Sequence, residues 1–206
     1  MSAAGLSSLL THDHGSPDAI IALARATFTG GIDLDPASDA KWNDRTGGVG
    51  ARRIITETED ARVTEWFPGA PLPMRLGTDR RCAPRDVAGW TLFCNPPNDK
   101  RGGLVNFFWR TIVEYWLRGW CRSAIYVGFN LEQAAKLQRI GARTSPLKHP
   151  TVIPAERPEY LDGKTLRPQT EPLHASFITL LSHTPSEIRT FISLGKELGD
   201  VAGPLI

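Results

Sequence analysis

The sequence predicts an α/β fold, and three observations lead to this prediction. Helix-like and strand-like patterns alternate along the 206 residues. Two apolar runs, 90–94 and 123–129, are too continuous for strands with one face in water and are typical of parallel strands covered on both faces. Hydrophobic residues make up 41% of the chain, which allows a sizeable core. We therefore expect one domain over residues 1–206, with a mainly parallel sheet and helices on both faces.

A helix and a strand are predicted at the start of the chain. Ser16, Pro17 and Asp18 form a typical helix start, because they offer a capping hydroxyl, a proline for the first turn and an acid near the positive end of the helix dipole. The helix is expected to end near Phe28, before a pair of glycines. The short apolar run at 32–35 then indicates a strand that the following proline stops.

The segment 42–88 shows no regular periodicity. Within it, residues 53–58 are expected to form a strand. Residues 68–85 are rich in proline, glycine and arginine, which indicates a long surface loop. Loops of such length in compact domains are usually functional or disordered, so this segment is a candidate for binding a partner.

The second half of the chain alternates more clearly. The helix predicted at 104–117 carries an apolar stripe at i, i+3, i+4 and i+7 spacing, which indicates packing against the core. The remaining predicted elements are strands at 90–94, 123–129, 151–153 and 176–181, and helices at 131–140 and 185–198. No helical pattern separates the last two strands, so one of them can run antiparallel.

Composition narrows the class of protein. Three cysteines without a CxxC pair favour a reducing compartment and no structural zinc. There is no signal peptide and no apolar stretch long enough to span a bilayer, so we expect a cytoplasmic protein without a membrane or metal partner. The histidine cluster at 12–14 is interpreted as part of a flexible tail rather than a metal site.

Basic residues gather in three clusters although the net charge is only +2. The clusters are Arg52 with Arg53, Arg80 and Arg81 with Arg85, and Lys100 with Arg101. Arginine binds phosphate through a planar fork of donors, which favours a nucleic-acid partner. The alternative for each cluster is a solvated surface.

The first of two unusual strand endings reads "GIDLDPAS". Asp33 and Asp35 alternate along the strand and so share one side of it. A carboxylate there can accept a hydrogen bond from an amino group or a ribose hydroxyl, or lie beside a sulfonium cation. The alternative is that Asp35 caps a helix in front of Pro36. Neither GxGxxG nor GxxxxGK[ST] is present, so the sequence gives little support for a dinucleotide oxidoreductase or a P-loop nucleotide site.

The second ending reads "LFCNPPN". The Asn95 side-chain oxygen and the Pro96 main-chain oxygen could accept both hydrogens of one exocyclic amine, with Pro97 stiffening the turn. Two such acceptors would offset the positive charge that grows on a planar amine as it is methylated. The alternative is a cap and turn, because asparagine and proline commonly end strands. In a parallel sheet both endings would face one crevice if the two strands are neighbours.

Taken together, these motifs resemble a known family. "SPDAIIALARATFTGGIDLDPAS" followed by "GWTLFCNPP" resembles the phage and prophage Dam-like DNA N6-adenine methyltransferases. "AIYVGFNLE" and "ERPEYLDG…HASFITLL" are similar to the later strands of that family. The resemblance implies a Rossmann-like methyltransferase fold, S-adenosylmethionine as the cofactor and DNA as the partner.

The resemblance also implies roles for individual residues. Those expected to line the cofactor pocket are Asp33, Asp35 and Pro36, with Ser16 and Pro17 near the methionine end and Glu57 or Glu59 at the ribose hydroxyls. Those expected to hold the target amine are Asn95, Pro96 and Pro97, with Asn98 facing the base. Those expected to meet DNA are Arg80, Arg81, Lys100 and Arg101. In this family the residue that corresponds to Asn98 is usually aromatic and stacks on the base.

Three functions stay open from the sequence. The first is methylation of adenine N6 in DNA, on a base turned out of the duplex. The second is a binding module of the same fold without turnover, because Asn98 cannot stack. The third is methylation of another planar amine or amide, such as an RNA base or a protein glutamine. The segment 42–88 and the C-terminal third of the chain are the alternative candidates for target recognition, whereas the target sequence, the DNA strandedness and the oligomeric state are not predicted.

Overall fold

The structure is a computed structural model, and it describes residues 14–85, 88–97, 103–129, 131–139, 143–156, 160–162 and 176–203. Its helices are α2 (Asp18–Thr27), α3 (Ala40–Asp44), α4 (Gly103–Leu117), α5 (Leu131–Arg139) and α6 (Pro185–Leu198), with short 3₁₀ turns η1 (Pro73–Arg75) and η2 (Pro146–Lys148). Its strands are β1 (His14–Gly15), β2 (Leu34–Asp35), β3 (Arg53–Ile54), β4 (Trp90–Cys94), β5 (Cys121–Gly128), β6 (Thr151–Pro154), β7 (Leu161–Asp162), β8 (Phe177–Ser182) and β9 (Gly199–Ala202).

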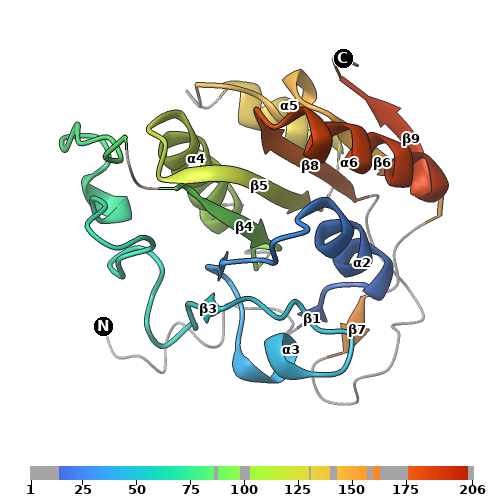
Figure 1. Cartoon of the computed structure of the whole chain (residues 1–206), viewed down its shortest axis with the longest axis horizontal. Coiled ribbons are helices and arrows are strands. Elements are labelled where there is room, and N and C mark those ends of the chain that lie inside the picture. Colours follow the sequence, from blue (N-terminus) through green and yellow to red (C-terminus); the bar gives the residue numbers. More distant parts are fainter. Residues whose placement is uncertain are drawn as a thin grey trace.

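Seven strands form one mixed sheet in the order β3-β2-β4-β5-β8-β6-β9 (Figure 1). The first four strands are parallel to one another. From β5 onward each neighbouring pair is antiparallel. The α/β fold is therefore confirmed, but the sheet is mixed rather than mainly parallel. The difference arises at β6 and β8, which carry no helical pattern between them and pair directly as antiparallel neighbours.

Helices cover both faces of the sheet, as predicted. Successive side chains of β4 point to opposite sides: Leu92 packs with α4 and α5, whereas Phe93 packs with α2 and α6. The apolar stripe of α4 is buried in the core cluster that contains Leu92, which confirms that the stripe belongs to the core. On the other face α2 and α6 contact each other (Figure 1). Among the described residues, no helix combines the length and apolar character that crossing a membrane requires.

Four short elements escape the sequence prediction. Helix α3 lies within the segment without periodicity, and β9 follows α6 as an edge strand beside β6. Strand β1 pairs antiparallel with β7, where His14 faces Asp162 and Gly15 faces Leu161. His14 is thus part of a strand pair, while the other two residues of the histidine cluster lie outside the described residues. Elements of two to five residues are too short to show a period in sequence.

The segment 68–85, expected to be a surface loop, is in part buried, because Ala70 and Leu76 belong to the core cluster that contains α4. The residues just before this segment are buried as well. Trp66 and Phe67 lie in the same core cluster as α4, and both rings pack on Tyr115 with centroids 5.5 and 4.9 Å away. The Trp66 indole donates a hydrogen bond to the Ala61 carbonyl at 2.8 Å. The segment 61–83 is therefore a packed covering of α4, because its two large rings are buried against the helix.

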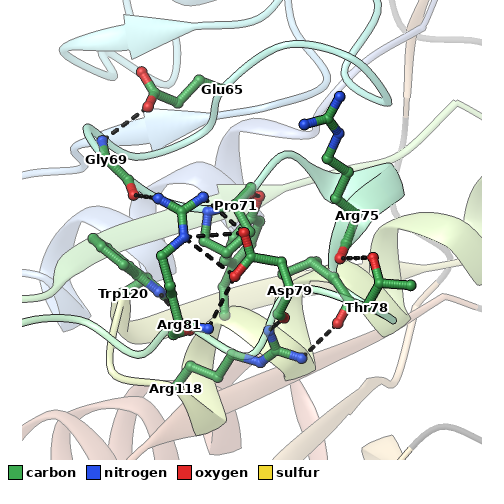
Figure 2. Close-up of polar contacts among 11 residues, drawn as sticks. Glu65, Gly69, Pro71, Arg75, Thr78, Asp79, Arg81, Arg118 and Trp120 are labelled. Atoms are coloured by element: carbon green, nitrogen blue, oxygen red, sulfur yellow. Dashed lines mark hydrogen bonds and ion pairs between the residues drawn. The ribbon is translucent and has the colours of Figure 1, made fainter.

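Arg118, just after α4, fixes the far part of this covering (Figure 2). Its guanidinium donates to the carbonyls of Leu76 at 2.7 Å and Asp79 at 2.5 Å, and it forms an ion pair with Glu114 at 2.7 Å. The hydroxyl of Tyr115 donates to the Pro71 carbonyl at 2.6 Å. A buried cation thus satisfies carbonyls of a segment that has little regular structure of its own.

Candidate functional site

The two unusual strand endings lie side by side in the sheet. Strands β2 and β4 are parallel neighbours, with Leu34 opposite Leu92. The winding of the sheet reverses here, because β3 pairs on one side of β2 and β4 on the other. In open α/β sheets, ligands bind beyond the carboxyl ends of strands at such a point. Asp35 ends β2, and Asn95 directly follows β4. The condition under which both endings would face one crevice, that the two strands are neighbours, is therefore met.

A small polar cavity of about 30 Å³ lies at this edge. The polar residues among its lining are Ser16, Asp35, Ser38, Arg45 and Asn95. Ser16 comes from the start of α2, and Arg45 directly follows α3. Four separate parts of the chain therefore bring hydroxyl, carboxyl, guanidinium and amide groups to one place. Three of the predicted site residues, Ser16, Asp35 and Asn95, meet here.

Asn95 is bonded through only one end of its amide. Its Nδ2 donates a hydrogen bond to Ser16 Oγ at 2.9 Å. Its Oδ1 is buried and accepts no hydrogen bond from the described residues. Buried polar atoms nearly always have partners, so an unpaired one next to a cavity marks a position where a ligand donor can bind. Pro96, which follows, is buried, and Pro97 is partly buried.

Ser16 differs from its predicted role as a helix cap. Pro17 occupies the N-cap position of α2, and its carbonyl accepts from the backbone amides of Ile20 and Ile21, each at 3.1 Å. No side chain caps this helix end. Ser16 lies one residue too early for its hydroxyl to reach the free amides of the first turn. The hydroxyl is instead available to Asn95.

Asp35 is the buried acid of the cavity, with 3% of its surface exposed. Burial raises the pKa of this carboxyl to about 7, although hydrogen bonds from the Ala37 amide and the Ser38 side chain act in the opposite direction. The Ala37 amide donates to Oδ1 at 3.1 Å. Pro36 is buried in the same turn. Because the charged form of Asp35 is poorly solvated, a cationic ligand group beside it would be strongly favoured.

Asp33 does not reach this cavity. It shares the predicted side of the strand with Asp35 but lies two residues nearer the amino end, about 7 Å along the strand. Its carboxylate accepts from the Thr91 amide at 2.9 Å and forms an ion pair with Arg52 at 2.9 Å. It lines a different hollow of about 270 Å³ together with Arg52, Trp90 and Arg122. The structure therefore separates Asp33 from the residues predicted to share its pocket.

The predicted ribose-binding acids lie on an exposed turn after β3. Glu57 is exposed and does not line the cavity. The Glu59 carboxylate accepts from the Thr56 amide at 2.8 Å, and this hydrogen bond lowers its pKa. The carboxyl of Glu59 is thus occupied by its own turn, and neither acid is placed beside Asp35.

Arg80 and Arg81 lie near the amino ends of the parallel strands, away from the cavity at the carboxyl ends. The Trp120 indole donates to the Arg81 carbonyl at 3.5 Å, and Trp120 also pairs with Trp90 at the start of β4. The Arg81 guanidinium is bonded to Asp79 at 2.8 Å and to the Gly69 carbonyl at 3.1 Å (Figure 2). These two arginines are therefore not brought together with Asn95. The other predicted contacts, Asn98, Lys100 and Arg101, lie outside the described residues.

Arg45 is the site residue that sequence reasoning missed. Its Nη2 donates to Asp18 Oδ1 at 2.6 Å and to the Ser16 carbonyl at 3.4 Å, whereas its buried Nε has no hydrogen-bond partner in the part of the chain that the structure describes. A signal for α3 was present, because Asp39 accepts from the Trp42 amide at 3.0 Å as an N-cap. No sequence pattern would show that the residue after this short helix turns back to α2.

Comparison of the chain with protein-family models, characterised proteins and solved structures finds no match. The cavity and the strand endings that form it are therefore the features of the molecule that indicate a function.

Proposed function

We propose that the protein is an S-adenosylmethionine-dependent methyltransferase that acts on adenine N6 in DNA, with the Rossmann-like sheet of that class. The observation that carries the proposal is the unpaired Asn95 Oδ1 at the switch point of the sheet, beside a buried carboxyl. Resemblance of both strand endings to the Dam-like family supports the same function. S-adenosylmethionine would supply an electrophilic methyl group.

The residues that line the cavity match the chemical groups of this cofactor. The volume of the cavity, however, is too small for the whole cofactor. Acid, guanidinium, hydroxyl and amide groups suit a ligand that carries both charges and several hydrogen-bonding groups. Sites for such ligands usually measure about 300–1,000 Å³, whereas this cavity holds a group of water size at about 30 Å³. Binding of the whole cofactor therefore requires the surrounding segments to open.

Asn95 would act on the target amine. With Nδ2 donating to Ser16 Oγ at 2.9 Å, the amide is oriented so that Oδ1 stays free as an acceptor. An acceptor aimed at the amine lowers the cost of the positive charge that appears on nitrogen during attack. The main-chain oxygen of Pro96 is the second acceptor in this proposal. Ser16 is then a positioning residue, because it acts through Asn95.

The proposal is tested by Asn95→Ala, with melting temperature, S-adenosylhomocysteine affinity and methyl incorporation measured on one preparation. We expect methyl transfer to fall by about 10²-fold or more, because a preorganised acceptor acts in the transition state. Cofactor affinity and melting temperature should change little. Asn95→Asp keeps an acceptor and should retain part of the activity. A destabilised Asn95→Ala variant with full activity would show that Asn95 only ends the strand.

The substrate is tested in the same assay by offering DNA, RNA and a glutamine-containing protein as methyl acceptors. Label in DNA that digestion identifies as N6-methyladenine supports the proposed substrate. Transfer to RNA or protein alone would keep the methyltransferase and replace the substrate class. Cofactor binding without transfer to any acceptor would identify the chain as a binding module.

A further inference from the structure

Two unpaired atoms of opposite hydrogen-bonding character belong to one cavity. Among the described residues, three buried side-chain nitrogen or oxygen atoms have no hydrogen-bond partner: Arg45 Nε, Asn95 Oδ1 and Trp116 Nε1. Arg45 and Asn95 line the same cavity. A buried donor and a buried acceptor left open in one cavity indicate that bound molecules present both an acceptor and a donor there. Asn95 has a role in the proposed function, whereas Arg45 has none.

The contacts of Arg45 hold its guanidinium in place and leave part of it available to a carboxylate. Its Nη1 donates to the Thr46 carbonyl at 3.3 Å, and the guanidinium lies 5.9 Å from the centre of the Trp42 ring. Carboxylates bind arginine through two parallel hydrogen bonds, one common pairing being Nε with Nη2. On this edge Nη2 is used by Asp18, while Nε is open. The Asp18 side chain is 72% exposed, so water can solvate its carboxylate at little cost when a ligand displaces it from Nη2.

The same cavity is also lined by an acidic residue. Asp35 is buried and lines the cavity together with Arg45. An α-amino acid group has a carboxylate and an ammonium on one carbon, so a cavity with one basic and one acidic residue matches both of its charges. Neither a neutral sugar nor a purine presents this combination of charges.

We propose that Arg45 binds the carboxylate of the α-amino-acid end of the cofactor, with Asp35 as the counter-charge for its ammonium. This inference rests on the proposed function, because it names a recognition residue for the same site. The ligand carboxylate completes the Nε–Nη2 edge and displaces Asp18 from Nη2. Arg45 thereby selects ligands that carry the amino-acid end over those that carry only the nucleoside.

Calorimetric titration of Arg45→Met with two ligands tests the inference. S-adenosylhomocysteine carries the amino-acid end, and 5′-methylthioadenosine lacks it. We expect Arg45→Met to weaken S-adenosylhomocysteine binding by about tenfold or more, because a charge-assisted pair is lost, and to leave 5′-methylthioadenosine binding unchanged. Arg45→Lys should fall between, because lysine keeps the charge without the fork. Arg62→Met, at an exposed arginine paired with Asp60 at 2.7 Å, is the matched control without an effect.

Asp18→Asn separates ligand binding from a structural role, because Arg45 also links α3 to the start of α2. If Arg45 binds the ligand, Asp18→Asn removes a competitor and should leave S-adenosylhomocysteine affinity equal or higher. Equal losses in Asp18→Asn and Arg45→Met, or equal losses for both ligands in Arg45→Met, would overturn the inference. Wild-type protein that binds neither ligand would refute the proposed function itself, and this inference with it.

Discussion

Asp35 is a carboxyl group that is poorly solvated and that lies at the candidate site. Its carboxyl is buried at the end of β2, where the Ala37 amide compensates only part of the lost solvation. Asn95, one strand away, likewise keeps Oδ1 without a partner. Buried groups left incompletely satisfied reduce stability, and proteins retain them mainly at functional sites. At the residue scale the site is therefore recognised by buried side chains whose polar groups are incompletely solvated or hydrogen-bonded.

The raised pKa of Asp35 predicts a specific dependence of stability on pH. Burial raises this pKa from 3.8 to about 7, so between these values the folded state holds a proton that the unfolded state has released. The stabilising effect of this proton is complete below about pH 4 and is lost as pH rises through about 7. Asp35→Asn removes the titration. Relative to wild type, the variant should therefore gain stability as pH rises through these values.

Urea unfolding of both proteins at several pH values measures this difference. Asp60→Asn is a control of opposite sign, because a hydrogen bond from Arg62 lowers the pKa of Asp60. The Asp60 carboxylate contributes stability above its ordinary pKa and loses it as pH falls, so Asp60→Asn should cost most at neutral pH. A constant difference between wild type and Asp35→Asn across the pH range would mean that Asp35 does not titrate there.

At the scale of elements, the segment 61–83 depends on α4 for its conformation. It contributes one short 3₁₀ turn of its own, η1. Trp66 and Phe67 anchor its first part, and Arg118 holds its last part through two carbonyls. In Figure 2 the Arg75 side chain points away from this cluster, whereas Arg118 lies beneath the segment. The loop is thus ordered by contacts with a helix that comes later in the sequence.

Arg118→Met should loosen this segment. Breaking a buried charged network costs about 3 kcal/mol or more, which corresponds to roughly 6–12 °C of melting temperature for a chain of this size. Hydrogen exchange should rise first in the amides of residues 76–83. Arg81→Met removes a surface pair and serves as the comparison, with little change in melting temperature. Similar melting temperatures for the two variants would show that Arg118 does not hold the segment.

How much of these elements the sequence predicts depends on their length and on their partners. Helix α4 and strands β4 and β5 are long enough to show an apolar pattern, and their positions follow from it. The parts without such a pattern were misjudged. The segment 68–85 is rich in proline and glycine, which is typical of a solvent-exposed loop. Its Ala70 and Leu76 are nevertheless buried against a helix that comes later in the sequence.

The candidate site follows the same rule. Asp35 and Asn95 were predicted because each directly follows an apolar strand, and parallel neighbours place such endings together. Arg45 was missed because its place depends on how the chain turns back to Asp18 after α3. The exclusion of Asp33 depends on register, which puts it beside Thr91 rather than Asn95. Positions set by strand order are predictable from sequence, whereas those set by long-range contacts are not.

At the scale of the whole molecule, the carboxyl ends and the amino ends of the parallel strands carry different chemical groups. The carboxyl edge at β2 and β4 carries Asp35, Asn95 and the approaching Ser16. The amino edge carries the 270 Å³ hollow with Asp33, and the segment that holds Arg80 and Arg81 lies near it. In the proposed function, target DNA would approach the carboxyl ends of these strands to deliver a base to Asn95. The basic clusters should therefore contribute unequally to DNA binding.

This asymmetry predicts different salt dependences for two double variants. Lys100→Gln with Arg101→Gln changes a cluster that follows Asn95 by only a few residues in the sequence, whereas Arg80→Gln with Arg81→Gln changes the cluster near the opposite edge. Each lost phosphate contact lowers the slope of log affinity against log salt by about 1 and weakens binding. We expect the first variant to lose about one or two units of slope and the second to keep the wild-type value. Fluorescence anisotropy with labelled duplex and single-stranded DNA over a salt series measures both. A loss of slope confined to the Arg80–Arg81 variant would place the DNA along the segment 61–83 and would separate the DNA surface from the Asn95 cavity.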